Sequence, residues 1–316
     1  MDISVIIPTY NREKILETTL QSFLKLKCEK ISYEIIIIDN NSDDETSIII
    51  EKYKDILPII YLFEEKPGKN NALNLGIRHS RGEILVFTDD DVLVDENWIG
   101  EIISSTLRFP GYNAFGGKIL PQFPDGTPEW IKTSEYSPFV YAIHDPDQGE
   151  GEYLNFGTPG GPNCWVRRNV FESGHMYDAD IGPRGCGRIS GSELEFFTRL
   201  LKLGMKPVYI PTAVVMHRIQ KFQTLKKYLI KRSYASGRGF VYINNDKKCH
   251  CLFGVPRYLF RQIIEATASA LYYYAKLDIK SAFEKVMIVA HRIGCVKQYR
   301  FILLNNSREM KGKGEC

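Results

Sequence analysis

Apolar runs alternate with amphipathic segments through the first ninety or so residues of the chain. Continuous apolar runs, typical of strands buried on both faces, occur at Ile3–Ile7, Tyr33–Ile38, Ile59–Phe63 and residues 84–88. Between the runs, apolar positions recur at helical spacing and predict helices over Arg12–Leu26, Thr46–Lys54 and Lys69–Ser80. Strand and helix in alternation predict an α/β fold around a mostly parallel sheet with right-handed crossovers.

The pattern changes in the second part of the chain. Residues 110–162 are rich in Pro, Gly and aromatic residues without sustained periodicity, which predicts strands and long loops. An amphipathic helix opens at Gly191–Glu195 and stops at Gly204, and the apolar run at residues 213–216 predicts another strand. Cationic and apolar positions then mix at Lys226–Arg232 and through a helix-like stretch from Arg257 to Arg300.

Charge is distributed unevenly along the 316 residues, although the net charge is only +3. Residues 1–216 contain 21 Lys and Arg against 32 Asp and Glu, a net charge of −11, whereas residues 217–316 contain 20 against 6, a net charge of +14. A basic module of this kind binds an anionic partner: nucleic acid, a phosphorylated acceptor or an anionic membrane surface. The alternative is a helical hairpin packed on the rest of the chain with a solvated basic face.

The sequence also predicts a cellular compartment. Met1-Asp2 leads directly into the first strand, so we expect no signal peptide, and no run reaches the roughly eighteen apolar residues of a membrane-spanning helix. Seven cysteines form no paired framework, which is typical of a reducing compartment; they are Cys28, Cys164, Cys186, Cys249, Cys251, Cys295 and Cys316. We expect a cytoplasmic protein, either free or peripheral on the inner face of the plasma membrane.

Three polar clusters follow predicted strands, at Thr9–Arg12, Asp39–Asp43 and Asp89–Asp91. The carboxyl ends of parallel strands meet at one edge of a sheet, where open α/β sheets bind their ligands. Three adjacent carboxylates repel one another unless a cation lies among them, and Mg²⁺ or Mn²⁺ takes one or two carboxylates together with substrate phosphates. Together the clusters predict a metal–nucleotide site, whereas the aspartates alone also fit a solvated acidic turn.

Two residues of the second part have both a structural and a catalytic interpretation. Ser192 and Glu195 fit a capping box, which leaves Glu193 either to complement the helix dipole or to act as a general base. His217 ends a predicted strand and is either a structural histidine or a third ligand for Mn²⁺. The glycine-rich turn Gly157–Asn163 is either a surface loop or a place where the backbone approaches a substrate closely.

In this order, these segments resemble the inverting family-two glycosyltransferases with the GT-A fold, of the type that builds bacterial polysaccharides and cell-surface glycans. The resemblance runs from about Ser4 to Gly239 and rests on Ser4–Arg12, Ile38–Thr46, Lys66–Asn74, Asp89–Asp91 and Gly191–Glu195. His217 and the basic run after it resemble the closing histidine and basic helix of the family. The chain departs from the Gly-Glu-Asp-x-Glu pattern at Ser192 and Glu193.

The resemblance implies roles for individual residues. Nucleotide-binding residues would be Pro8, Thr9, Tyr10, Arg12, Asp39, Asn41, Gly68, Lys69, Asn74, Asp89 and Asp90. Asp91, with Asp89 and His217, would hold a divalent metal, Mn²⁺ or Mg²⁺, and Glu193 would be the catalytic base. Contacts to the donor or acceptor sugar would come from Gly160, Gly161, Asn163, Trp165 and Glu195.

The implied activity is metal-dependent, inverting transfer of a sugar from a nucleotide-diphospho-sugar, by default a UDP-sugar, to a hydroxyl of a glycan or lipid-linked acceptor. The implied division is a nucleotide-sugar half at 1–110, an acceptor-binding and catalytic half at 111–220, and a basic helical extension at 221–316. No nucleic-acid partner is expected, and the oligomeric state is open.

Two other functions compete with this interpretation. A nucleotidyltransferase that makes sugar nucleotides would carry a Gly-rich phosphate loop after its first strand, where this chain has Pro8–Arg12. A non-catalytic module that binds sugar nucleotides or an anionic polymer would use the basic extension but would not need Asp89–Asp91.

Overall fold

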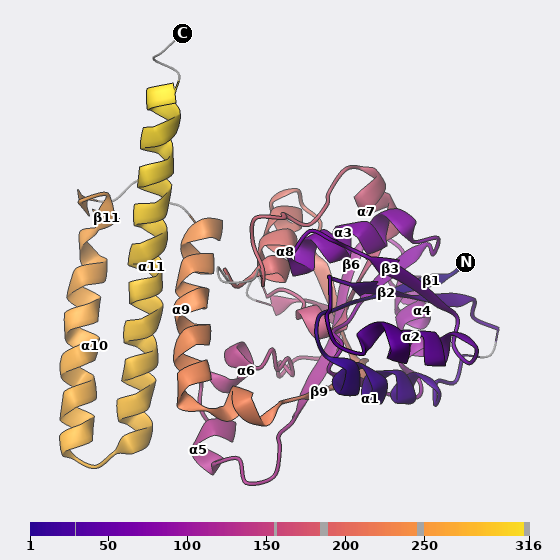
Figure 1. Cartoon of the computed structure of the whole chain (residues 1–316), viewed down its shortest axis with the longest axis horizontal. Helices are drawn as coiled ribbons and strands as arrows, with labels where there is room; N and C mark the ends of the chain where they lie inside the picture. Colours follow the sequence, from indigo (N-terminus) through magenta and orange to yellow (C-terminus); the bar gives the residue numbers. More distant parts are fainter. Residues whose placement is uncertain (29, 155–156, 184–188, 245–249, 313–316) are drawn as a thin grey trace. The chain divides into compact units, whose positions relative to one another are not determined.

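A computed structural model describes residues 1–28, 30–154, 157–183, 189–244 and 250–312. The chain divides into two compact units (Figure 1). Unit 1 comprises Met1–Asp125, Ser137–Gly187 and Ser192–Gln220, and unit 2 comprises Gly126–Tyr136, Arg188–Gly191 and Lys221–Cys316. Of the cysteines, Cys186, Cys249 and Cys316 lie outside the described residues.

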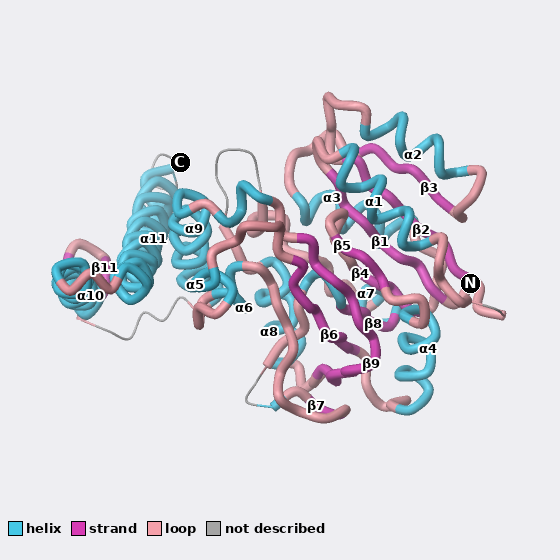
Figure 2. Tube along the Cα trace, turned by 90° about the horizontal axis from the view of Figure 1, so that it is seen from below, coloured by secondary structure: helices cyan, strands magenta, loops and turns pink. Residues whose placement is uncertain are grey.

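A nine-stranded sheet forms the centre of unit 1 (Figure 2). Its order is β3-β2-β1-β4-β8-β6-β9-β5, with β7 also paired to β9. The strands are β1 (Ile3–Thr9), β2 (Tyr33–Asp39), β3 (Ile59–Phe63), β4 (Ile84–Phe87), β5 (Val92–Val94), β6 (Ala114–Gln122), β7 (Gly151–Glu152), β8 (Cys164–Arg167) and β9 (Pro207–Arg218). The first four strands in the chain are parallel, β8 is antiparallel to both of its neighbours, β6 and β9 are parallel, and β5 is antiparallel to β9.

Helices cover both faces of this sheet. They are α1 (Glu13–Phe23), α2 (Thr46–Lys54), α3 (Lys69–His79), α4 (Trp98–Arg108), α6 (Ser137–Val140), α7 (Arg168–Glu172), α8 (Ser192–Lys202) and the 3₁₀ turn η2 (Gly161–Asn163). Val5 of β1 belongs to the core that contains Leu20 of α1, whereas the next residue, Ile6, belongs to the core that contains Leu73 of α3 and Phe196 of α8. Burial on both faces explains the uninterrupted apolar runs of β1, β2 and β4, whereas β3, at the edge of the sheet, is only partly buried and was wrongly predicted to be buried on both faces.

Unit 2 is mainly helical. It contains α5 (Glu129–Lys132), η3 (Lys221–Thr224), α9 (Lys226–Ile243), the small hairpin β10 (Cys251–Leu252) and β11 (Val255–Pro256), α10 (Arg257–Ala275) and α11 (Ile279–Gly312). Within the unit, α11 lies between α9 and α10 (Figure 1). A Cβ at Gly237 of α9 would lie 1.8 Å from the backbone oxygen of His291 in α11, so this glycine lets the two helices approach closely. The stretch predicted as helical from Arg257 to Arg300 is two helices, because a turn at residues 276–278 interrupts it. The structure also contains no helix, within the described residues, that is both long enough and apolar enough to cross a membrane.

Candidate active site

Strand register brings the polar clusters of unit 1 to one edge of the sheet. Thr9 at the end of β1 pairs with Asp39 at the end of β2, and Ile6 pairs with Phe87 of the neighbouring β4. The side chain of Thr9 then donates a hydrogen bond from Oγ1 to Oδ2 of Asp90, at 2.8 Å. The first and third clusters are therefore in direct contact, as the alternation of strands and helices predicted.

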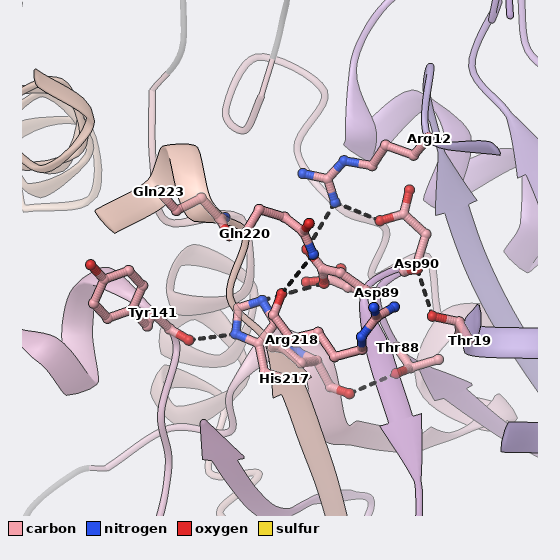
Figure 3. A network of polar contacts seen from close by, with 12 residues as sticks. Arg12, Thr19, Thr88, Asp89, Asp90, Tyr141, His217, Arg218, Gln220 and Gln223 are labelled. Carbon is pink, nitrogen blue, oxygen red and sulfur yellow. Dashed lines mark hydrogen bonds and ion pairs between the residues drawn. The ribbon is translucent and has the colours of Figure 1, made fainter. Parts of the chain in front are cut away.

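Arg12 holds two of the three aspartates in place (Figure 3). Its Nη1 lies 2.6 Å from Oδ1 of Asp90 and 2.8 Å from Oδ2 of Asp91. Thr19 of α1 also donates from Oγ1 to the backbone oxygen of Asp90, at 2.6 Å. Burial raises the pKa of the Asp90 carboxyl to about 6, although Arg12 acts in the opposite direction. Asp90 is thus held by β1, α1 and Arg12, inside the protein.

Asp91 faces His217, which lies near the end of β9. The Nε2 atom of His217 is 3.3 Å from Oδ1 of Asp91, and its Nδ1 is 2.6 Å from the backbone oxygen of Tyr141 (Figure 3). A carbonyl oxygen only accepts, so Nδ1 carries the proton and Nε2 is the nitrogen turned toward Asp91. Burial alone would lower the pKa of His217 and raise that of Asp91. Their mutual attraction, with Arg12 acting on Asp91, outweighs burial, so the pKa of His217 is raised and that of Asp91 is lowered.

The Asp91–His217 pair suits a divalent cation. Oδ1 of Asp91 is buried and receives no hydrogen bond of good geometry, so the pair presents one carboxylate oxygen and one imidazole nitrogen. Both are ligands that Mn²⁺ accepts. Across the described part of the chain, no three His, Cys, Asp or Glu groups converge as a complete metal site. A cation held here would therefore take its other ligands from a substrate or water, as Mg²⁺ and Mn²⁺ do at phosphate-binding sites.

Lys69, the first residue of α3, connects the third polar cluster, Asp89–Asp91, to α8. Its Nζ is 2.7 Å from Oδ1 of Asp89 and 2.8 Å from Oε1 of Glu193. Burial disfavours the charged ammonium, but the two carboxylates outweigh it and raise the pKa of Lys69. The lysine therefore stays cationic and holds two carboxylates that lie far apart in the sequence.

Asn40, which was not among the predicted site residues, holds the loop before Lys69 in place. Oδ1 of Asn40 accepts a hydrogen bond from the backbone N–H of Gly68, at 2.7 Å. Its Nδ2 donates to the backbone oxygens of Glu64 and Lys66, at 3.0 and 2.8 Å. The only sequence signal for this role was the position of Asn40 directly after β2, between two residues that were assigned.

The remaining nucleotide-binding candidates occupy different environments. Asp39 is buried, accepts a hydrogen bond from the backbone N–H of Ser42 at 2.8 Å and lies 3.2 Å from the hydroxyl of Tyr61. Tyr10 and Asn41 are exposed beside it, whereas Pro8 is buried within β1.

Asn74 has a structural partner. Its amide donates to the backbone oxygen of Tyr177 and accepts from the backbone N–H of the same residue, at 2.8 and 3.0 Å. The resemblance implied a nucleotide contact for Asn74, but its amide instead fixes the segment that precedes α8.

Three residues predicted to contact sugar instead have packing, hydrogen-bond or ion-pair partners within unit 1. Trp165 is fully buried in β8 and stacks on Phe115, with ring centroids 5.8 Å apart. Asn163 is also fully buried; it accepts from Trp98 Nε1 and donates to the backbone oxygens of Lys118 and Ala213.

Glu195 forms a bidentate ion pair with Arg199, one turn further along α8. The partners of Trp165 and Asn163 lie far away in the sequence and cannot be identified from the local pattern, whereas Arg199 lies one turn from Glu195 and was identifiable.

Gly160 and Gly161 remain next to the site. A Cβ on Gly160 would meet the side chain of Ile119 at 2.5 Å, and one on Gly161 would meet Oε1 of Glu193 at 2.4 Å. Gly161 therefore allows the carboxylate of Glu193 to lie against the backbone of η2.

If Glu193 is the base of the glycosyl transfer that the sequence resemblance implies, replacing Gly161 with alanine is expected to displace it and to lower turnover by about 10- to 100-fold, since a misplacement of about 1 Å at such a group has effects of that size. Nucleoside diphosphate release under saturating substrate measures it. Gly111→Ala is the control, because a Cβ there meets no atom within 4 Å. Full turnover in Gly161→Ala would show that the position of Glu193 is unimportant.

Comparisons with known proteins identify similar sequences and similar folds. The sequence model described as "Glycosyl transferase family 2" matches residues 4–174. The chain is 23% identical over 242 residues to the glucosyl-dolichyl phosphate glucuronosyltransferase of Haloferax volcanii, covering 75% of each protein. It is 24% identical over 242 residues to the succinoglycan biosynthesis protein ExoM of Rhizobium meliloti, covering 75% of this chain and 74% of the relative.

Solved structures show the same fold. The mannosyltransferase PcManGT of Pyrobaculum calidifontis, in complex with GDP-Man and Mn²⁺, matches with a TM-score of 0.65 and 17% identity over 94% of this chain and 86% of the other. TarS 1–349 of S. aureus, in complex with UDP-GlcNAc, matches with a TM-score of 0.53 and 15% identity over 98% and 92%. The predicted GT-A architecture with a helical C-terminal region is thereby confirmed.

Proposed function

The chain belongs to glycosyl transferase family 2, and from this membership we propose that it is a metal-dependent, inverting glycosyltransferase. It would move a sugar from a nucleotide-diphospho-sugar, by default a UDP-sugar, to a hydroxyl of a glycan or lipid-linked acceptor. A lipid-linked acceptor is in keeping with the Haloferax volcanii relative, whose name contains glucosyl-dolichyl phosphate. Membership of a glycosyltransferase family also favours this function over a nucleotidyltransferase or a non-catalytic binding module.

The main support for the proposal is that the ammonium of Lys69 contacts both Asp89 and Glu193. Asp89 stands in the aspartate cluster proposed to bind the donor, and Glu193 is the proposed base. Both carboxylates lie within 2.8 Å of the same Nζ, although one follows β4 and the other opens α8. A base placed beside the donor-binding carboxylates is what transfer between two bound substrates requires.

In the proposed mechanism, Asp91 and His217 would hold Mn²⁺ or Mg²⁺. When bound, the cation would offset the negative charge that develops on the diphosphate leaving group. Asp39 and the surrounding loop would bind the nucleoside portion of the donor. Lys69, whose Nζ lies 2.8 Å from Oε1 of Glu193, would orient this carboxylate until the acceptor binds.

Glu193 would then remove the proton of the acceptor hydroxyl. The oxygen attacks the anomeric carbon, the bond to the nucleoside diphosphate breaks on the opposite side, and the configuration at that carbon inverts. Glutamate has one methylene more than the aspartate usual at this position. The contact with Gly161 is what lets this longer side chain lie close to the backbone.

Nucleotide binding tests the proposal directly. In a thermal-shift panel of UDP, GDP, dTDP and CMP, with Mn²⁺ or with EDTA, one diphosphate is expected to stabilise the protein only when Mn²⁺ is present. At a ligand concentration of a hundred times Kd the stabilisation is about 2.7 kcal/mol, which raises Tm by several degrees. A shift of equal size in EDTA would contradict metal dependence, and the absence of any shift would contradict nucleotide binding.

A further inference from the structure

The outer face of α10, together with the turns at its two ends, carries exposed apolar side chains. Ile264 and Leu271 of α10 are 69% and 65% exposed. They share one helical face with Ala268 and Ala275, which are also exposed. The opposite face of α10, with Leu259, Ala266 and Ala270, packs in unit 2. The helix is therefore apolar on two sides, and α11 accounts for one of them.

The turn between α10 and α11 gives the strongest indication that this face has a partner. Leu277 has a φ of 58° and is 83% exposed. The position after a helix end normally holds Gly or Asn, because other residues are destabilised in the left-handed region. The turn is well formed, since Leu277 N donates to the backbone oxygen of Tyr274 and the carboxylate of Asp278 accepts from the backbone N–H of Ser281. A leucine at this position is unfavourable twice, because its backbone is in the left-handed region and its apolar side chain is exposed to water. Contact between this side chain and an apolar medium would explain its presence.

The other end of α10 repeats this arrangement. The tight turn of the β10–β11 hairpin places Phe253 at a φ of 51° with 81% exposure. An exposed apolar residue in the left-handed region thus stands just before and just after the apolar stripe of α10.

The charges around the stripe are mainly positive. Arg257 and Arg261 lie at its beginning, and Lys276 and Lys280 lie at its end, where the ammonium of Lys276 sits 4.5 Å from the ring centre of Tyr272. The acidic residues of the same stretch are Glu265, which is 3.5 Å from Arg261, and Asp278, which caps α11.

We propose that this face of α10, with Phe253 and Leu277 at its ends, docks on an anionic lipid surface. The helix would lie in the plane of the membrane with its apolar stripe among the acyl chains and its basic residues at the headgroups. A second copy of the chain is less suitable as a partner, because residues 217–316 carry a net charge of +14 and two such surfaces repel.

Vesicle sedimentation of the full chain at low salt tests the proposal. Binding to phosphatidylcholine mixed with phosphatidylglycerol is expected to exceed binding to phosphatidylcholine alone by about tenfold or more, and to weaken as salt is added. The double variant Ile264→Glu/Leu271→Glu is expected to bind at least about tenfold more weakly.

Leu277→Asn separates docking from folding, because asparagine suits the left-handed turn. Its Tm should stay level or rise, while vesicle binding falls about three- to tenfold. Leu107→Asn is the matched control: Leu107 is a leucine of unit 1 that is 75% exposed on α4, and its replacement should leave vesicle binding unchanged.

Equal binding to both kinds of vesicle, or binding by the α10 and Leu277 variants that matches the parent protein, would overturn the proposal. A dimer that the double variant dissociates, without any change in vesicle binding, would also overturn it and would identify a second copy as the partner.

Discussion

Glu193→Gln is expected to lower turnover by about 10²- to 10⁴-fold, the range that a positioned general base contributes. Glutamine has nearly the same shape but cannot take the acceptor proton. Donor binding should change little, because the metal–diphosphate contacts proposed for Asp91 and His217 are untouched. Release of nucleoside diphosphate with saturating acceptor measures turnover, and the Mn²⁺-dependent thermal shift measures donor binding.

A control for this substitution is Glu17→Gln. Glu17 also pairs with a lysine, Lys52, but this pair lies on the surface of α1 and α2. The same chemical change there should leave turnover and nucleotide binding at the parent level. If Glu193→Gln turned over as fast as Glu17→Gln, Glu193 would not be the base.

Asp91→Asn is expected to abolish the Mn²⁺-dependent part of nucleotide stabilisation and to lower turnover by about 10²- to 10³-fold. Losses of that size follow the removal of a group that stabilises developing charge. The amide oxygen can still accept from Arg12, but a neutral side chain attracts a cation far less strongly than a carboxylate. Isothermal titration with Mn²⁺ and the nucleotide chosen by the thermal-shift panel gives the affinity.

The fold of the Asp91→Asn variant needs its own measurement, because Asp91 is buried between Arg12 and His217. Its Tm without nucleotide is expected to fall, because a neutral amide no longer pairs with the buried charges of Arg12 and His217. Nucleotide binding is therefore compared at a temperature at which both proteins are folded. Nucleotide binding that stays as strong and as Mn²⁺-dependent as in the parent would remove Asp91 from the proposed metal site.

The first half of the fold was predictable because its elements follow from periodicity alone. Residues 3–7 and 33–38 are uninterrupted apolar runs, and parallel pairing of such runs necessarily brings the residues after them to one edge. The contact between Thr9 and Asp90 follows from that register. Local pattern was sufficient here because β1, β2, β3 and β4 pair in parallel, so their carboxyl ends share one edge whatever their order in the sheet.

The second half was less predictable because its contacts connect distant segments. Nothing near Lys69 in the sequence indicates that its ammonium meets Glu193 of α8. The resemblance implied a sugar contact for Trp165, yet its place in β8 between β4 and β6 buries it against Phe115. Pairing partners of this kind are a property of the sheet order, which periodicity does not specify.

The pairing of β5 with the distant strand β9 delays completion of the site while the ribosome synthesises the protein. β5 begins one residue after Asp91, and its strand partner is β9, which ends at Arg218. The ribosome must therefore add more than a hundred residues after Asp91 before β9 exists to pair with it. At about 5–20 residues per second, this delay is roughly 6 to 25 seconds. During that interval the nascent chain carries its acidic triplet without the strand that brings His217 to it.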